Sequence, residues 1–439
     1  MKRIIRFSTT MMERYLPDPF LFVVILTLVV FGLGLALTGS SPVEMVAFWG
    51  EGFWGLLAFS MQMVLVLVTG FVLASSPIFK KGLGKLASFA NTPGSAIVWV
   101  TLVSLAASWI NWGFGLVIGA LFAKELAKRV PNVDYRLLIA SAYSGFLIWH
   151  AGFSASIPLS IATDGHPFID QIGIIPTSQT IFASYNVIIV LMLIVILPIL
   201  NHLMMPNKNE TVVVDSDILK EEPVEKVPTK DSLTPAEKLE NSWILSMVIG
   251  LLGISFLVYY FNHNGFALTL DIVNFLFLFL GVLFHGTPRK YLIAVQNAVK
   301  GAGGIIIQFP FYAGIMGMMT ASGLAAIMSE AFVNISTDFT FPLFAFLSAG
   351  IVNFFVPSGG GQWAVQAPIM LDAAQSLGVE PAKVAIAVAW GDAWTNMIQP
   401  FWALPALAIA GLKAKDIMGF CLIILFVSGA VIGLGLLLL

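Results

Sequence analysis

The sequence contains little charge. Of its 439 residues only 10% are Asp, Glu, Lys or Arg, whereas 58% are hydrophobic. Soluble domains carry about 25% charged residues, so this composition excludes the soluble globular class and predicts an integral membrane protein. Uncharged runs such as Phe20–Leu37, Val187–Leu200 and Phe420–Leu439 supply the apolar stretches from which spanning helices of about 20 residues are built.

Several other features are scarce or missing. The alternation of apolar and polar residues that marks a closed β-barrel is absent, so the spans are predicted to be helices. Cys421 is the single cysteine, which excludes an intramolecular disulfide and a cysteine metal cluster. A net charge of −2 gives no reason to expect a nucleic-acid partner. Because no HExxH, Walker or GxSxG pattern occurs, we expect neither an enzyme nor a bound cofactor.

The distribution of Lys and Arg predicts the topology, since these residues concentrate in short cytoplasmic loops. Lys2, Arg3 and Arg6 indicate a cytoplasmic N-terminus. No small-residue cleavage signature accompanies a short apolar region, so Phe20–Thr38 is predicted to be a retained helix. Gly39–Gly52 has acidic residues but no cation and is predicted to be an outer loop, whereas the loops around Lys80 and Arg289 are basic and predicted to be inside. The same alternation along the chain leaves the C-terminus on the outside.

The stretch Ile351–Met370 interrupts a membrane-grade apolar run with Pro357, Ser358 and three glycines, Gly359 to Gly361. Proline removes a backbone donor and glycine destabilises helices, so we expect no intact helix through this stretch. At membrane depth, unwound backbone is tolerated only where it is buried in protein or lines a water-filled cavity. We predict a re-entrant hairpin whose glycine N–H groups bind an anion; a plain extramembrane loop is the alternative.

A second broken segment lies in the first half of the chain. Ala96–Ala123 is interrupted at Asn111 and has cations on both sides, which predicts a hairpin that enters from the cytoplasm. Weak matches between the halves, such as Ile110-Asn111 with Val352-Asn353, recur at a nearly constant offset. Paired interruptions of this kind are typical of secondary transporters with a site at the interface of inverted repeats.

The domain prediction follows from these repeats and from the one markedly hydrophilic stretch. The predicted units are a first inverted repeat at 1–205, a hydrophilic cytoplasmic linker at 206–242, a connecting helix at 243–267 and a second inverted repeat at 268–439. Each repeat is expected to contain one hairpin and one broken transmembrane helix.

Ionisable residues at membrane depth are costly and mark candidate functional sites. Asp392 lies in the long span Val384–Ala410 and is followed by Thr395 and Asn396, a pattern that predicts an unwound helix. These oxygens are candidates for coordinating Na⁺, or Asp392 for carrying a proton; a structural Asp bonded to a neighbouring helix is the alternative. His150, in the predicted helix Leu137–Ala162, is a candidate for a proton or substrate role or a packing residue.

The hairpin tips and their neighbours are the candidate substrate site. No Lys or Arg lies in either tip, so a monoanion held by amides and helix dipoles is favoured over a dicarboxylate. Aromatic residues in the same segments are core residues or walls for a short alkyl chain, namely Trp363, Trp390, Trp394, Phe401 and Trp402. The predicted substrate-binding residues are Asn111, His150, Asn353, Ser358, Gly359, Gly360, Gly361, Gln362, Trp363 and Asn396.

Three segments carry a resemblance to a known family. INWGFGLVIGALFAKELAKR (Ile110–Arg129), VNFFVPSGGGQWAVQAPIM (Val352–Met370) and AWGDAWTNMIQPFWALPALAIAG (Ala389–Gly411) resemble the bacterial short-chain fatty acid transporters, carriers of acetoacetate and butyrate. The resemblance covers nearly the whole chain. It implies an inner-membrane protein of the wider ion-transporter superfamily, with an elevator mechanism, opposed hairpins and a homodimeric assembly. The Ser-Asn-Thr triplet of that superfamily's dicarboxylate members is absent here.

We therefore expect an all-α polytopic membrane protein that carries short-chain monocarboxylates together with Na⁺ or H⁺. Asp392, Thr395 and Asn396 are the predicted ion-coupling residues. A cation/proton antiporter that uses Asp392, another organic-anion carrier, an anion channel and a membrane-bound enzyme are the alternatives.

Overall fold

The computed structural model describes residues 19–207, 209–214, 219, 233–353, 356 and 358–439. These residues form helices and connecting turns without any strand, which confirms the all-α prediction. The predictions made for residues 1–18, for Pro357 and for most of the 206–242 linker lie outside the described residues.

The first half of the described chain ends with the helix before the linker. Its elements are α2 (Pro19–Leu37), α3 (Pro42–Gly52), α4 (Leu57–Ala74), α5 (Pro77–Ala87), α6 (Pro93–Ile110), α7 (Trp112–Arg129), α8 (Tyr135–Ser144), the 3₁₀ helix η1 (Gly145–Ala151), α9 (Ser156–Ile161), α10 (Ile169–Ile172), η2 (Thr177–Gln179) and α11 (Ser184–Leu203).

The second half begins with a short helix after the linker. Its elements are α12 (Pro235–Glu240), α13 (Trp243–Asn264), α14 (Leu270–His285), α15 (Pro288–Val299), α16 (Gly303–Ala321), α17 (Leu324–Ile335), α18 (Phe341–Asn353), α19 (Gly359–Leu377), α20 (Pro381–Thr395), η4 (Asn396–Ile398), α21 (Pro400–Ala410) and α22 (Ala414–Leu438).

By length and composition, several helices are suited to cross a membrane. Within the described ranges, seven segments are long and apolar enough, namely α4, α6, Tyr135–Ile161, α11, α13, α16 and α22. A bilayer-spanning helix needs about 20 mainly apolar residues, which these segments provide or approach. The protein is therefore a multi-pass membrane protein.

Three segments expected to be loops are helices instead. The predicted outer loop Gly39–Gly52 contains α3, and the predicted basic loops around Lys80 and Arg289 form α5 and α15. Each of these helices begins with Ser-Pro or Thr-Pro, in which the hydroxyl residue takes the N-cap position and proline fits the first turn. Thr-Pro also begins α6 and α12. The Ser-Pro and Thr-Pro pairs therefore indicate these helix starts, whereas the placement of charges does not.

One prediction holds and one needs correction in its detail. Leu137–Ala162 is a broken helix, as expected in each repeat: it is divided into α8, η1 and α9, with non-helical backbone between Ala151 and Ser156. The three glycines expected in the unwound tip form the first turn of α19, because Ser358 caps that helix immediately before them.

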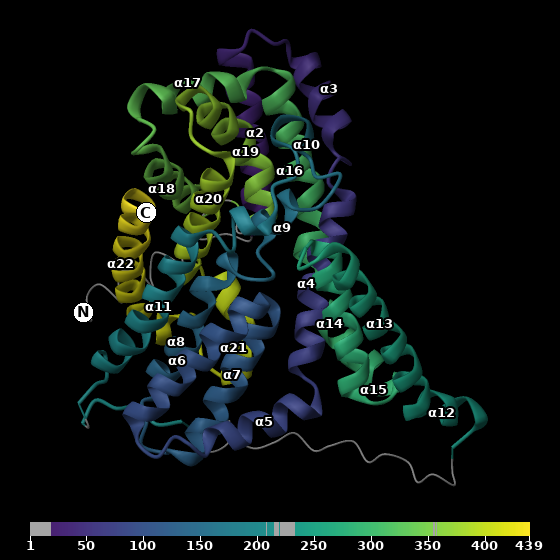
Figure 1. The fold of residues 1–439 in the computed structure, drawn as a ribbon. Coiled ribbons are helices and arrows are strands. Elements are labelled where there is room, and N and C mark those ends of the chain that lie inside the picture. The colour runs from purple at the N-terminus through teal and green to yellow at the C-terminus, as the bar shows by residue number, and fades with distance from the viewer. Residues whose placement is uncertain (1–18, 208, 215–218, 220–232, 354–355, 357) are drawn as a thin grey trace.

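Two groups of helices lie side by side in Figure 1. The hairpin bundle, defined as α6 to α11 and α18 to α22, contains both broken segments and has close packing of α18 on α20 and of α6 on α7 and η1. The outer bundle, defined as α2 to α4 and α13 to α16, is held by the packing of α16 on α2 and α3 and of α14 on α4 and α13. The bundles touch where α4 meets α7 and α16 meets α19.

The close packing of α18 on α20 depends on Gly391 of α20. A Cβ built there would approach the backbone of α18, lying closest to the Phe346 carbonyl oxygen and 3.0 Å from the Gly350 nitrogen. Because backbone atoms cannot move aside cheaply, any larger residue would force α18 and α20 apart.

We expect Gly391→Ala to lower the thermal stability of the purified protein. The cost of such overpacking is about 1–3 kcal/mol. Gly82→Ala on α5 is the matched control, because a Cβ there meets nothing within 4 Å and alanine favours a helix. Melting temperatures in detergent measure both. A Gly391→Ala melting curve superimposed on that of the wild type would contradict this account of the packing.

Candidate functional site

The first hairpin turns at Asn111, which is fully buried. Its side-chain oxygen accepts a hydrogen bond of 2.9 Å from the Phe114 amide, so it caps α7, and its NH₂ group donates to the Val66 carbonyl of α4 at 3.4 Å. The next amide, of Trp112, donates to the Ser154 hydroxyl at 2.9 Å. The tip of this hairpin is thus held by α4 and by the break between η1 and α9.

The second hairpin resumes at Ser358, whose hydroxyl oxygen accepts from the Gly361 amide at 3.4 Å and caps α19. The three glycines are buried against different neighbours. A Cβ at Gly360 would meet Phe59 and Phe309 at 2.7 and 3.4 Å, and one at Gly361 would lie 2.5 Å from the Tyr312 ring. Two of the glycines therefore let the hairpin bundle pack directly on aromatic rings of the outer bundle.

Gly359 faces the other way. A Cβ there would overlap the imidazole of His150 and lie 3.0 Å from the Trp149 ring. The start of α19 is thereby brought onto the broken segment of the first half. The sequence predicted these glycines as anion donors, and the structure assigns them a role in close packing as well.

His150 and Asp392 form a buried pair that joins the broken helix α8–η1–α9 to the broken helix α20–η4–α21. The imidazole Nδ1 lies 2.9 Å from Asp392 Oδ2, and both side chains are almost completely enclosed. The other ring nitrogen, Nε2, accepts a hydrogen bond of 3.1 Å from the Ile157 amide at the start of α9. A nitrogen that accepts is not protonated, so this arrangement corresponds to a neutral imidazole that donates from Nδ1 to the carboxylate.

The segment after Asp392 is held by polar contacts. Asn353 donates to the Asp392 carbonyl at 2.7 Å and to the Thr395 hydroxyl at 2.9 Å, and Asn396 donates to the same Asp392 carbonyl at 2.8 Å. Gln399 donates from its side chain to the Asn353 carbonyl. These contacts fix the tip of the second hairpin to the end of α20, where the predicted break occurs at η4 and Gln399.

Four buried side-chain oxygens around this segment have no hydrogen-bond partner in the described structure. They are Asn353 Oδ1, Gln362 Oε1, Asp392 Oδ1 and Gln399 Oε1. Buried oxygens are normally satisfied, and leaving one without a partner costs about 1–3 kcal/mol. Carboxylate and amide oxygens are also the ligands that hard cations prefer. Asp392 Oδ1 is therefore a candidate to bind a proton or a small cation.

Asn396 connects this network to aromatic residues of the first half. Its side-chain oxygen accepts from the Trp149 indole at 3.2 Å, and its carbonyl accepts from the Tyr143 hydroxyl at 2.7 Å. Trp149 also stacks on His150, with ring centroids 4.0 Å apart. The two broken segments thus form one continuous polar and aromatic unit.

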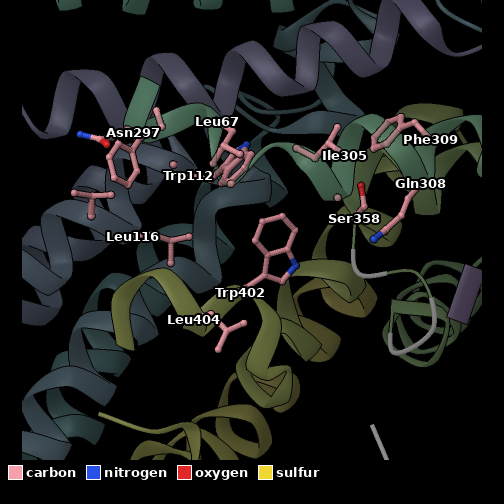
Figure 2. Close-up of a pocket in the computed structure, with 16 residues that line it drawn as sticks. Leu67, Trp112, Leu116, Asn297, Ile305, Gln308, Phe309, Ser358, Trp402 and Leu404 are labelled. Carbon is pink, nitrogen blue, oxygen red and sulfur yellow. The ribbon is translucent and has the colours of Figure 1, made fainter. Parts of the chain in front are cut away.

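A cavity of about 370 Å³ lies between the two bundles. It is lined by Leu67, Phe71, Trp112, Gly113, Leu116, Val117, Asn297, Ala298, Gly301, Gly304, Ile305, Gln308, Phe309, Ser358, Trp402 and Leu404. Figure 2 shows Ser358 and Gln308 at one end, Asn297 at the other and Trp402 in between. None of these lining residues is charged, and most are apolar.

The cavity contains neutral hydrogen-bond donors. Gln308 accepts from the Tyr312 hydroxyl at 3.0 Å through its oxygen, which fixes the amide and leaves its NH₂ group as a donor. Trp112 lines the cavity beside Leu67 (Figure 2), and its buried indole nitrogen has no partner among the described residues. The Ser358 oxygen accepts from a backbone amide, so its hydroxyl hydrogen remains available.

Three helices begin beside this cavity. Trp112 and Gly113 open α7, Ser358 is the N-cap of α19, and Trp402 lies in the first turn of α21. The first turn of a helix has amides without internal partners and carries the positive end of the helix dipole. An uncharged cavity with three such helix starts is suited to a small anion.

Few of the residues predicted to bind substrate or ion line the cavity, and the others lie outside its lining. Ser358 and Trp402 line the cavity. The cavity lining does not include Asn111, His150, Asn353, Gly359, Gly360, Gly361, Gln362, Trp363, Asp392, Thr395 or Asn396. Gln362 instead bonds the Ala349 carbonyl and Gln366, and Trp363 packs on Phe168.

The remaining aromatic candidates lie elsewhere. Trp390 donates to Asn186 at 2.9 Å and Trp394 to the Leu425 carbonyl at 2.7 Å, while the side chain of Phe401 lies outside the described residues. Sequence reasoning missed Trp112, Gln308 and Phe309. Trp112 follows the Asn111 turn directly, a position that could have marked it, whereas nothing in the sequence places α16 beside α19.

Known proteins resemble this chain over its full length. The family model described as short chain fatty acid transporter matches residues 1–439. Two relatives named "Putative short-chain fatty acid transporter", from Escherichia coli K12 and Haemophilus influenzae, are each 48% identical, with alignments that cover 99% of both chains. The crystal structure of the Alcanivorax borkumensis YdaH transporter, described as having an unusual topology, has a similar fold.

That structural similarity has a TM-score of 0.62 and covers 96% of this chain and 97% of the other. Because the sequence identity is 16%, it bears on the fold alone.

The His150–Asp392 pair is testable by a double-mutant cycle. We expect His150→Ala to destabilise the protein, because it leaves the buried Asp392 carboxyl without its hydrogen-bond donor, at a cost of about 1–3 kcal/mol. In the background of Asp392→Ala the same substitution should cost far less, because alanine offers the imidazole no acceptor. Melting temperatures of the four proteins measure the coupling, with His263→Ala, an exposed histidine, as control. Additive effects would contradict a direct interaction.

Proposed function

Because this chain belongs to the short-chain fatty acid transporter family, we propose that it is a secondary active carrier of short-chain monocarboxylates such as acetoacetate and butyrate. The observation that carries the proposal is the uncharged cavity beside the starts of α7, α19 and α21. Its substrate is a monoanion, since a second carboxylate would meet no countercharge among the lining residues.

The carboxylate binds at the Ser358 end in this proposal. The Ser358 hydroxyl, the Gln308 NH₂ group and the Trp112 indole are the side-chain donors, supported by the amides that begin α19. Hydrogen bonds to a charged group contribute about 1.5–3 kcal/mol each, so a few neutral donors suffice for weak, reversible binding. The acyl chain then contacts the apolar lining. Asn111, Asn353 and Asn396 do not contact the substrate in this proposal. They hold the hairpin tips and the end of α20 in position and so affect binding indirectly.

Cation coupling is assigned to the network around Asp392. Its carboxylate is enclosed, is paired with a neutral imidazole and has one oxygen without a partner. An enclosed negative charge is stable only with a bound cation or after protonation, and either event would alter the contact between the two broken segments. Na⁺ or H⁺ bound here, next to the substrate cavity, therefore provides the coupling, with Thr395 and Asn396 positioning Asp392.

The transport movement proposed is of the elevator type. The hairpin bundle would shift along the outer bundle. Gly360 and Gly361 have no side chains to interlock with the aromatic rings they contact on the outer bundle, which favours sliding at this interface. Two successions of similar elements, α3 to α11 and α15 to α22, support an inverted repeat. The domain boundaries 1–205, 206–242, 243–267 and 268–439 are kept as part of this proposal, as is a homodimer.

The proposed location is the bacterial inner membrane. The lysines of α5 and the basic residues of α15 lie at one end of the molecule, and the positive-inside rule assigns this end to the cytoplasm. Asn297, at the far end of the cavity, is exposed on α15, so the cavity opens to the cytoplasm in this conformation. The N-terminus is then cytoplasmic and the C-terminus outside.

A cation/proton antiporter is the second candidate, favoured by the enclosed Asp392 and by its unpaired oxygen. An antiporter would exchange cations without any carboxylate, whereas the proposed carrier moves the cation together with its substrate. Uptake of labelled butyrate into proteoliposomes, with Na⁺ and pH gradients imposed separately, distinguishes the two. We expect uptake that one gradient stimulates; no uptake of any short-chain acid under either gradient would refute the carrier.

Substrate recognition is tested at Trp112. We expect Trp112→Phe to raise the apparent KM for butyrate about tenfold, because it removes one donor to the carboxylate but keeps an aromatic wall. Gln308→Glu should abolish uptake, since it places a negative charge at the carboxylate site. Trp54→Phe, an exposed tryptophan outside the cavity, is the matched control. Wild-type kinetics in both cavity variants would show that the carboxylate binds elsewhere.

Coupling is tested separately at Asp392. We expect Asp392→Asn to lose stimulation by the cation gradient while butyrate still binds, because the asparagine has no charge for the cation to balance. Gradient-driven uptake and equilibrium binding of butyrate are measured on the same preparation. Uptake that responds to the gradient as the wild type does would remove Asp392 from the coupling site.

A further inference from the structure

Part of the cavity is apolar and contributes no hydrogen-bond donor to a carboxylate. This apolar arm runs between the bundles, bounded by Leu67 of α4, Leu116 and Val117 of α7 and Ile305 of α16. Figure 2 shows Leu67, Leu116 and Ile305 around the space that separates Ser358 from Asn297. An apolar arm next to a group of donors has the shape of a site for an anionic head and an alkyl tail.

The dimensions of the arm limit the tail. From Trp112, one of the proposed donors, to Leu116 is about one helical turn, a rise of about 6 Å along α7. Because an extended alkyl chain zigzags, each carbon–carbon bond of roughly 1.5 Å advances it by about 1.25 Å, so a tail of about four to five carbons spans that distance. A chain that fits as far as Leu116 is therefore short.

One wall of the arm leaves open space because it contains a glycine, Gly301. Gly301, in the turn between α15 and α16, lines the cavity. A Cβ built on it would lie 3.6 Å from the Ala298 carbonyl oxygen and 3.7 Å from Leu67 Cδ2, which is ordinary van der Waals contact. Its backbone does not require glycine, since it is not among the described glycines with positive φ. The space beside Gly301 is thus available to the ligand and can be filled by substitution.

We infer that this arm is the acyl-chain subsite and that Leu116 and Gly301 determine the chain length that the protein accepts. The inference rests on the proposed carboxylate transport. Leu116 is 6% exposed and bounds the arm on the α7 side, whereas Gly301 bounds it on the opposite side by having no side chain. A larger residue at Gly301 shortens the usable arm, and a smaller residue at Leu116 lengthens it.

The test compares uptake of acetate, butyrate and hexanoate by proteoliposomes of each variant. We expect Gly301→Leu to reduce uptake of butyrate relative to acetate by about tenfold, the discrimination that one or two methylene groups provide in an apolar pocket. We expect Leu116→Ala to raise uptake of hexanoate relative to butyrate several-fold. Gly301→Leu fills open space and so tests the inference even if Leu116→Ala impairs folding.

Two matched controls separate chain-length selection from general effects. Gly303→Leu makes the same change two residues away, where nothing lies within 4 Å and no cavity is lined. Leu121→Ala makes the same change on α7 at a partly buried position away from the cavity. Both should keep the wild-type chain-length profile.

Two results would overturn the inference while leaving the proposed function intact. An equal loss of acetate and butyrate uptake in Gly301→Leu would mean that the substitution blocks the cavity mouth. An unchanged profile in Gly301→Leu with wild-type rates would place the acyl chain elsewhere. Failure of the wild type to take up any of the three acids would instead refute the proposed function.

Discussion

The structure depends on how it accommodates helix ends that lie deep inside a membrane protein. Each helix start leaves amides without partners, and in the absence of water these need side chains, other backbone or a ligand. Asn111 and Ser358 satisfy part of this requirement as caps of α7 and α19. The amides that remain, together with the dipoles, favour a small anion at the point where the helices begin.

In the proposed carrier, the same kind of constraint connects substrate and cation. The broken helices α8–η1–α9 and α20–η4–α21 bring His150 and Asp392 within 2.9 Å, a pair that neither helix could form alone. Asn353 and Asn396 both donate to the Asp392 carbonyl, so a change at the carboxylate acts directly on the second hairpin. Movement of that hairpin alters the cavity, because Ser358 at its end belongs to the lining. Coupling by this route requires no charged residue in the substrate site.

Much of the architecture was predictable from residues. Apolar runs gave the helical membrane class, and Asn111 and the Pro-Ser-Gly stretch marked the two hairpins, since polar or helix-breaking residues at membrane depth have few explanations. Ser358 and Trp402, both named as candidates from the sequence, line the cavity. The Asp392–His150 pair, Gln308 and the packing of Gly360 on Phe59 were not predictable, because they depend on how distant helices meet. The Ser-Pro and Thr-Pro pairs indicate the starts of α3, α5 and α15, but the placement of charges led to a prediction of loops there.

The central claim, that the carboxylate lies at the shared helix starts, is tested most directly by a structure of the protein with 4-bromobutyrate bound. Anomalous scattering from bromine locates the tail independently of the carboxylate density. The account predicts a carboxylate within hydrogen-bonding distance of Ser358 and the Trp112 indole, with bromine in the arm near Leu116. A carboxylate bound outside this cavity, or the reverse orientation with bromine at Ser358, would contradict it.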